Sequence, residues 1–344
     1  MGIRTAVRQK IRKDEHRMSE KRKIIMDCDP GTDDSVCIIM ALTHPDVELL
    51  GITTESGNLT ADKTAANALR ILEYMDRGDI PVARGMMHPM LREYPKDPYS
   101  HGEDGLGNHF FPEPKLKVTD KSPAQLIVDT VLENPGEVTL ICTSCLTNVA
   151  VAFMSRPEII PLIKEIYHIG GAYGITEYAF RNATGDNPMS EWNIFVDPEA
   201  ARIVYESDVK LTSIGLDIAF NPEAVNISEE TLEKIRGIGN RQAKYALEII
   251  DYIDRNNSIQ EEGIFINGPI DTTAMCCFLN PEIMTDVREI HVAIDCGGPL
   301  TRGMTIWDRR DHFRWEHLPK IRTVFAVDGQ KYQETFYRAL GGKE

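Results

Sequence analysis

Four aspartates lie within eight residues near the start of the chain, in the stretch KIIMDCDPGTDDSVCIIMAL: Asp27, Asp29, Asp33 and Asp34. The apolar runs on either side have the composition of buried segments. Carboxylates crowded at the edge of a core repel one another, and some take up protons unless a cation neutralises them. Calcium accepts an irregular set of carboxylate, carbonyl and water oxygens. We therefore interpret the stretch as part of a metal site.

Helix capping is the competing explanation for these acids. Asp33 or Asp34 suits the N-cap or first turn of the helix that follows, where a carboxylate accepts backbone N–H groups. Capping accounts for one or two of the aspartates. It does not account for Asp27 and Asp29, which come directly after the apolar run IIM.

Strand-like and helix-like segments alternate from Lys23 to the C-terminal end, which indicates an α/β single domain with a mostly parallel central sheet flanked by helices. Ligands bind such open sheets beyond the carboxyl ends of the strands. We expect strands at 24–28, 47–56, 80–85, 137–144, 209–215, 288–295 and 320–328, a further strand followed by a glycine turn within 159–174, and helices at 34–44, 61–75, 124–135, 197–207, 232–257, 269–281 and 328–340.

Composition narrows the class of protein. The net charge of -15 argues against nucleic acid as a partner, because nonspecific binding to phosphates needs a basic surface. No apolar run approaches the roughly 20 residues that cross a membrane, so we expect no membrane association. Seven cysteines in a 344-residue chain do not suggest a disulfide framework. A reducing cytoplasm fits them better.

The first residues differ from the rest of the chain. Residues 1–22 are rich in Arg and Lys and lack the apolar middle of a secretory signal. We expect a basic, dispensable extension there, with a start at Met18 as one explanation and a short functional arm as another. Residues 23–344 then form one catalytic domain.

Two motif classes begin in a similar way. Haloacid dehalogenase phosphatases carry D-x-D-x-[TV] after the first strand, but Gly31 occupies the fifth position here. An EF-hand loop needs Gly at position six and Glu at position twelve, where this chain has Thr32 and Ile38. Both patterns match less well than a third.

The arrangement DCDPGTDD after a strand resembles the nucleoside hydrolase family of the inosine–uridine-preferring type. Five further segments follow in the order of that family, so the resemblance runs from about Lys23 to the end of the chain. They are GNLT at 57–60, HGEDGLG at 101–107, CTSCLTN at 142–148, SEWNIFVDPEAA at 190–201 and TRGMTIWD at 301–308.

The resemblance implies a calcium site and a general base. Asp29, Asp34 and Asp271 would bind Ca²⁺ through carboxylates, and Thr143 would bind it through its backbone carbonyl. Asp29 would also take the proton from the attacking water. Such a metal holds and activates water in hydrolases. Asp27 would support the aspartate cluster.

The same resemblance implies a ribose site. Asp33 and Asn193 would bind the 2′- and 3′-hydroxyls, Glu191 the 5′-hydroxyl, and Asn58 would support the water. A solvated turn or helix cap is the alternative role for Glu191 and Asn193.

Three departures from the family pattern are visible. Gly185 replaces an asparagine of the 5′-hydroxyl site, and Asp186 or Asn187 is near enough to substitute. The turn A-T-G-P has become Cys142-Thr-Ser-Cys145, which we interpret as two buried thiols because no further zinc ligands accompany it.

The third departure concerns the leaving base. Ile270 stands directly before Asp271, where the family has a histidine that protonates the base. Either the nucleobase leaves without this acid, or the nucleobase is unusual, or another group supplies the proton. His101 is the candidate acid that we favour, since histidine titrates near neutrality. We expect His109 to be a solvent-facing loop residue and His168 a core residue. Trp192 and Ile270 would then hold the base by stacking and shape.

We therefore predict Ca²⁺-dependent hydrolysis of the N-glycosidic bond of a ribonucleoside, in the cytoplasm, by a homodimer or homotetramer. Three alternatives remain open at this point. They are a hydrolase for a modified deazapurine nucleoside such as queuosine, a dehalogenase-type phosphohydrolase, and a noncatalytic nucleoside-binding relative.

Overall fold

The computed structural model describes residues 21–96, 100–181, 184–260, 268–310 and 315–343. Within them, nine strands form one sheet in the order β3-β2-β1-β4-β5-β6-β9-β7-β8. The first seven strands in this order are parallel, whereas β7 is antiparallel to both β9 and β8. The strands are β1 Arg22–Cys28, β2 Val47–Thr54, β3 Val82–Arg84, β4 Thr139–Cys142, β5 Glu165–Ile169, β6 Leu211–Ile214, β7 Met284–Ile294, β8 Thr305–Trp307 and β9 Lys320–Val327.

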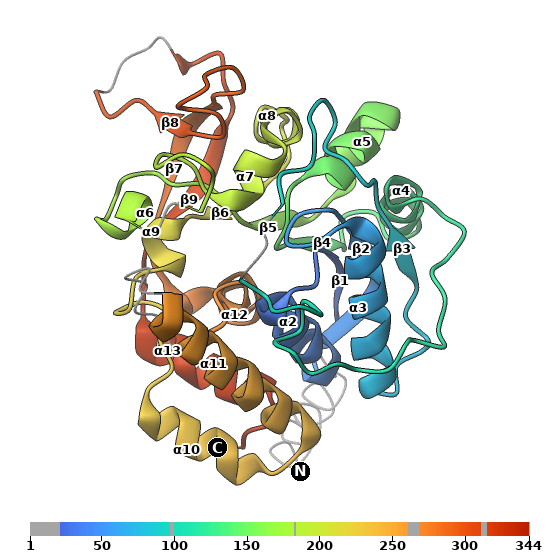
Figure 1. The fold of residues 1–344 in the computed structure, drawn as a ribbon. Helices are drawn as coiled ribbons and strands as arrows, with labels where there is room; N and C mark the ends of the chain where they lie inside the picture. The colour runs from blue at the N-terminus through green and yellow to red at the C-terminus, as the bar shows by residue number, and fades with distance from the viewer. Residues whose placement is uncertain (1–20, 97–99, 182–183, 261–267, 311–314, 344) are drawn as a thin grey trace, which may run out of the picture.

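Helices cover both faces of the sheet (Figure 1). On one face α2 packs against α3, α11, α12 and α13, and on the other α5 packs against α4 and α8. The helices are α2 Thr32–Thr43, α3 Ala61–Tyr74, α4 Pro123–Glu133, α5 Thr147–Ser155, α6 Tyr178–Arg181, α7 Trp192–Val196, α8 Pro198–Tyr205, α9 Leu216–Ala219, α10 Glu229–Ile238, α11 Arg241–Gln260, α12 Thr272–Leu279 and α13 Gly329–Ala339; Pro157–Leu162 and Pro281–Ile283 are short 3₁₀ turns.

Alternation along β1 explains why the sheet has two cores. Ile24 and Met26 pack into the cluster beneath α2 and α3, and Ile25 packs into the cluster beneath α4 and α5. Side chains of a strand alternate between faces, so Asp27 falls on the same side as Ile25. That placement brings its carboxylate toward the start of α5.

The predicted fold class is confirmed, with two local differences. The single helical region expected at 232–257 is broken into α10 and α11 at Gly239, whose φ of 71° is left-handed. Glycine adopts that conformation at little cost and commonly ends helices. The reversed direction of β7 was not predicted, because strand patterns carry no information on direction.

The described part of the chain begins just before β1. Residues 1–20 of the predicted extension lie outside the described residues, and Arg22 already belongs to β1, where its guanidinium donates to the Phe278 carbonyl (2.7 Å). None of the helices in the described ranges combines the length and apolar character that a membrane span requires.

Candidate active site

The predicted site residues lie where parallel strands end side by side. β1 lies between β2 and β4, and its Asp27 pairs with Thr53 on one side and Cys142 on the other. The Thr143 N–H donates to the Asp27 carbonyl (3.0 Å), which extends the ladder by one residue. The segments after β1, β2 and β4 are therefore fixed against one another by the sheet itself.

Asp33, Asp34 and Asp271 form the tightest acidic group among the described residues. One carboxylate oxygen from each lies within 4.8 Å of the others, and all three side chains are buried. Asp33 and Asp34 come from the first turn of α2, and Asp271 precedes the first residue of α12. The fold thus joins positions that are far apart in the sequence, as the resemblance implied.

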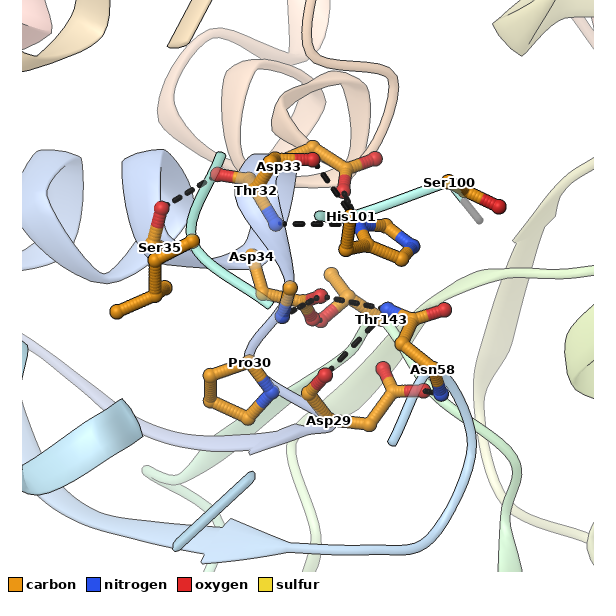
Figure 2. A network of polar contacts seen from close by, with 12 residues as sticks. Asp29, Pro30, Thr32, Asp33, Asp34, Ser35, Asn58, Ser100, His101 and Thr143 are labelled. Carbon is orange, nitrogen blue, oxygen red and sulfur yellow. Dashed lines mark hydrogen bonds and ion pairs between the residues drawn. The ribbon is translucent and has the colours of Figure 1, made fainter. Parts of the chain in front are cut away.

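Asp29 lies beside this group but outside it. Its Oδ2 accepts the Asn58 N–H (2.5 Å), and its Oδ1 is buried without a hydrogen-bond partner. Asn58 also donates through Nδ2 to Asp34 Oδ2 (3.1 Å), so this one amide residue orients two carboxylates. A Cβ at Gly57 would overlap Asp29 Oδ2, which is why only glycine fits there. Figure 2 shows Asp29, Asp34 and Asn58 meeting below the ring of His101.

The capping explanation for the acids holds in part. Gly31 is the N-cap of α2, and its N–H donates to Asp34 Oδ2 (3.1 Å). Asp34 Oδ1 accepts in addition from the Thr143 hydroxyl (2.6 Å). Asp34 therefore caps its helix and also contributes to the acidic group. Asp29 has no such capping contact in the described structure.

Burial and mutual repulsion dominate the electrostatics. Burial, with repulsion from Asp33, raises the pKa of Asp34 from its ordinary value of 3.8 to about 6. Burial, with the charge of Asp34, raises the pKa of Asp29 well above its usual range. Burial, with the charge of Asp33, does the same to the pKa of Asp271. Without a cation, Asp29, Asp34 and Asp271 would therefore bind protons at a higher pH than exposed aspartates do.

The donor set fits a hard divalent cation. Within the described residues no Lys or Arg pairs with Asp29, Asp33, Asp34 or Asp271, and the one ionisable partner is His101, whose Nδ1 lies 3.8 Å from Asp33 Oδ1. Two buried carboxylate oxygens, Asp29 Oδ1 and Asp33 Oδ1, have no hydrogen-bond partner. Carboxylate oxygens of this kind are the ligands that Ca²⁺ and Mg²⁺ prefer.

His101 reaches the site from the long segment between β3 and α4. Its Nδ1 accepts the Thr32 N–H (3.1 Å) and lies 2.9 Å from the Thr32 hydroxyl. Because Nδ1 accepts, the neutral ring carries its proton on Nε2. His109 does not face open solvent as expected: its Nε2 lies 3.0 Å from Glu248 of α11. His168 is fully buried in the core, as predicted.

Glu191 and Asn193 are buried at the start of α7. Glu191 is the N-cap of that helix, and its carboxylate accepts the N–H groups of Asn193 (2.8 Å) and Ile194 (3.0 Å). Burial raises the pKa of Glu191 to about 7. Asn193 donates through Nδ2 to the Thr143 carbonyl (3.2 Å), the oxygen predicted to bind metal. Asn193 and Thr143 are therefore neighbours in this site.

The other predicted substrate contacts are less direct. The Asn187 amide donates to the Arg302 carbonyl (3.0 Å) and accepts the Met189 N–H (3.0 Å), so it organises its own loop. Trp192 stacks on Phe195 with ring centroids 6.0 Å apart, and its buried Nε1 has no hydrogen-bond partner.

Two buried residues at the strand ends were not predicted to take part. Glu55 follows β2, and Asn148 lies in the first turn of α5. Asn148 donates through Nδ2 to Asp27 Oδ1 and through its N–H to Glu55 Oε1, both at 2.9 Å. A carboxylate directly after an apolar strand was the sequence signal for Glu55, and it is the same signal that identified Asp27.

Solved structures with this architecture are nucleoside hydrolases. A plant nucleoside hydrolase superposes with a TM-score of 0.81 at 27% identity, over 93% of this chain and 98% of that one. A purine-preferring ribonucleoside hydrolase from Gardnerella vaginalis gives 0.80 at 27% identity, over 92% and 98%. The class of protein is thus a nucleoside hydrolase fold with an acidic site at the carboxyl ends of its strands.

Sequence comparison gives the family. The pattern of the inosine-uridine preferring nucleoside hydrolases matches residues 24–334. The pyrimidine-specific ribonucleoside hydrolase RihA of Shewanella sp. (strain MR-7) is 36% identical over 321 residues, which cover 93% of this chain and 96% of that protein. The chain belongs to the inosine-uridine preferring nucleoside hydrolase family. It is a ribonucleoside hydrolase, an enzyme that cleaves N-glycosidic bonds, and the phosphohydrolase and noncatalytic alternatives are set aside.

The raised pKa of Asp34 predicts that the free energy of unfolding of the metal-free protein, measured with a chelator present, depends on pH. A group whose pKa is higher in the folded state stabilises the fold as it takes up a proton. Between about pH 8 and about pH 5 wild type should therefore gain about 1 kcal/mol more than Asp34→Asn, or about 2 °C in melting temperature. Calorimetric scans with EDTA measure this. Equal pH slopes for the two proteins would contradict it.

A side chain at position 57 should push Asp29 out of its place in the site, because a Cβ there would overlap Asp29 Oδ2. Gly57→Ala should displace Asp29 and lower metal affinity or activity about 10- to 100-fold, as changes beside metal ligands do. Calcium titration and initial rates measure it. Gly237→Ala is the matched control, because a Cβ there meets nothing within 4 Å. Activity of Gly57→Ala equal to that of the control would refute the steric argument.

Proposed function

We propose that this chain is a calcium-dependent ribonucleoside hydrolase in which Asp29 is the general base. The observation that carries the proposal is the free, buried Oδ1 of Asp29 beside the Asp33, Asp34 and Asp271 group. A bound calcium ion would position a water and lower its pKa. Asp34, Asp271, Asp29 and the Thr143 carbonyl are the proposed ligands.

The proposed reaction uses the chain's own groups at each end of the bond. Asp29 accepts a proton from a water molecule as the oxygen of that water attacks the anomeric carbon of the ribose. The C–N bond breaks, and its electron pair passes to the leaving nucleobase. Positive charge develops on the ribose in the transition state, as in other glycoside hydrolyses. Asp33 and Asn193 bind the 2′- and 3′-hydroxyls, and Glu191 and Asn187 lie toward the 5′-hydroxyl. Hydrogen bonds from these side chains orient the sugar.

His101 is the proposed acid for the leaving base. To act as an acid the ring must be an imidazolium, which carries a proton on both nitrogens. Its Nδ1–H would then face the Thr32 hydroxyl (2.9 Å) and Asp33 Oδ1 (3.8 Å), and its Nε2–H would be donated to the leaving nucleobase. This arrangement replaces the acid that the family places next to the last metal-binding aspartate, where this chain has Ile270.

The walls of the nucleobase site are proposed to recognise the nucleobase by its shape. Ile270 packs with Tyr178, Phe180 and Phe220 around Leu216 and the short helices α6 and α9. This apolar cluster borders Asp271. Trp192 is the aromatic side chain that we assign to stacking on the nucleobase.

Pyrimidine ribonucleosides are the substrates we propose first, since the curated relative named above is pyrimidine-specific. The apolar cluster around Ile270 supports a modified deazapurine nucleoside such as queuosine as the second candidate. Mass spectrometry of bases released from a mixed pool of uridine, cytidine, inosine and queuosine would distinguish them.

The setting of the enzyme is also proposed. All seven cysteines are free, which favours a reducing compartment such as the cytoplasm. By family resemblance we infer a homodimer or homotetramer, which sedimentation would test.

Removing the metal ion should stop turnover, and replacing the general base Asp29 should strongly lower it. EDTA should stop release of free base from the nucleoside pool, and added Ca²⁺ should restore it. Asp29→Asn should lower kcat about 10²- to 10⁴-fold, the usual effect of losing a general base. Rates from a coupled ribose assay measure both. Full turnover by Asp29→Asn would show that another group accepts the proton.

The effect of replacing His101 on the cleavage rate should depend on the leaving group. His101→Ala should slow nucleoside cleavage about 10²-fold or more. It should barely affect p-nitrophenyl riboside, because nitrophenolate leaves without a proton. His109→Gln is the control, since His109 is on the same segment but contacts Glu248. Equal losses on both substrates would assign His101 to binding or folding.

A further inference from the structure

Asn67 is a buried amide that connects separate parts of the chain. It lies in the middle of α3, where its side chain is fully buried. Its Nδ2 donates to the Pro30 carbonyl and to the Asp104 carbonyl, both at 3.1 Å. Its Oδ1 accepts from Arg70 Nη1 (2.8 Å). Because the cationic side chain of Arg70 faces the amide oxygen, both N–H groups of Asn67 are directed at the two carbonyls.

Pro30 is the fixed side of this connection. It follows the proposed general base Asp29 and precedes Gly31, the N-cap of α2. The Gly31 N–H is bonded to Asp34, and the Asp29 carbonyl accepts from Asn58 Nδ2 (3.3 Å). The end of β1 and the start of α2 therefore hold Pro30 from both sides.

Asp104 belongs to a closed turn, residues 101–110, that carries His101. The Asp104 carboxylate accepts three backbone N–H groups of this turn, those of Leu106 (2.8 Å), Asn108 (2.9 Å) and Phe110 (2.6 Å). The Gly107 N–H donates to the His101 carbonyl (3.0 Å), which closes the turn. These bonds make the turn a single unit, so an anchor at Asp104 also fixes the backbone of His101.

The turn comes close to α3 at Gly105. The φ of Gly105 is 77°, which is left-handed, and a Cβ there would overlap Leu59 and lie 2.9 Å from Asn67 Nδ2. Only glycine combines this conformation with this close approach. Thr32 contacts the ring of His101 directly, whereas Asn67 holds the backbone that carries the ring. The two contacts therefore fix different parts of the proposed acid.

We propose that Asn67 is a positioning residue that fixes the turn carrying His101 against the Pro30 carbonyl, and so sets the place of the proposed acid relative to the proposed base Asp29. The inference rests on the proposed function, in which His101 gives a proton to the nucleobase and Asp29 takes one from water. A misplacement of about 1 Å in such a pair can cost about 100-fold in rate.

Asn67→Asp tests the proposal with little change in shape. The aspartate can still accept from Arg70, but as a carboxylate it cannot donate to the Pro30 and Asp104 carbonyls. Its kcat for nucleosides should fall about 10- to 100-fold. Its kcat for p-nitrophenyl riboside and its calcium affinity should stay within a few-fold of wild type, because neither depends on the acid.

Asn240→Asp is the matched control. The Asn240 amide likewise donates to a carbonyl of a separate segment, that of Leu340 (2.8 Å), and accepts the Ala243 N–H. Because these contacts involve none of the proposed site residues, Asn240→Asp should leave the rates on both substrates unchanged.

A double-mutant cycle gives a result that a purely structural role would not produce. In a His101→Ala background, Asn67→Asp should lower the nucleoside kcat only a few-fold further, because the acid that it positions is absent. Equal losses of Asn67→Asp on the two substrates, or an undiminished further loss in the His101→Ala background, would overturn the proposal. If Asn67→Asp does not fold, Asn67→Ala is judged by the same criteria, since it removes both amide bonds without adding a charge.

Hydrogen exchange separates failure of this proposal from failure of the proposed function. The backbone amides of residues 101–110 should exchange faster in Asn67→Asp than in wild type and in Asn240→Asp, since the turn loses its anchor. Unchanged exchange there would overturn the proposal even if the wild type is an active hydrolase. A wild type that cleaves neither substrate would end the proposed function, and the exchange rates would then decide whether Asn67 holds the turn.

Discussion

Repulsion among buried carboxylates is the constraint on which this structure depends. Asp29, Asp33, Asp34 and Asp271 share a space with no lysine or arginine paired to them among the described residues. The raised pKa values of Asp29, Asp34 and Asp271 express the cost of that arrangement in the absence of a cation. A fold keeps such a cost only where the surrounding structure enforces it. Here the enforcement comes from the sheet, since adjacent parallel strands end at the same edge.

Neutral donors, not opposite charges, orient the acids. Asn58 contacts Asp29 and Asp34, the Thr143 hydroxyl contacts Asp34, and Asn148 contacts Asp27 and Glu55. A neutral donor fixes the direction of a carboxylate without cancelling its charge. The charge thus remains available for a cation or a developing positive sugar.

The sequence predicted the fold class and the neighbours of the site, but not how each side chain is used. Asp29 could be placed at a strand end from the sequence alone, whereas Asp271 was joined to it only by the resemblance to the family. The tight acidic group instead contains Asp33, which depends on the first turn of α2. Glu191 was correctly suspected of capping a helix, but its burial depends on α7, which is too short to show periodicity. Glu55 and Asn148 were missed because their roles arise from side-chain contacts between separate strands.

The position of β9 in the sheet affects the order in which the chain folds during its synthesis. This strand, Lys320–Val327, pairs with β6 on one side and β7 on the other, so it is an interior member of the sheet. Translation delivers it after every proposed ligand residue has emerged. A nascent chain can therefore assemble β1 to β6 early, yet it must keep the edge of β6 open until β9 has emerged.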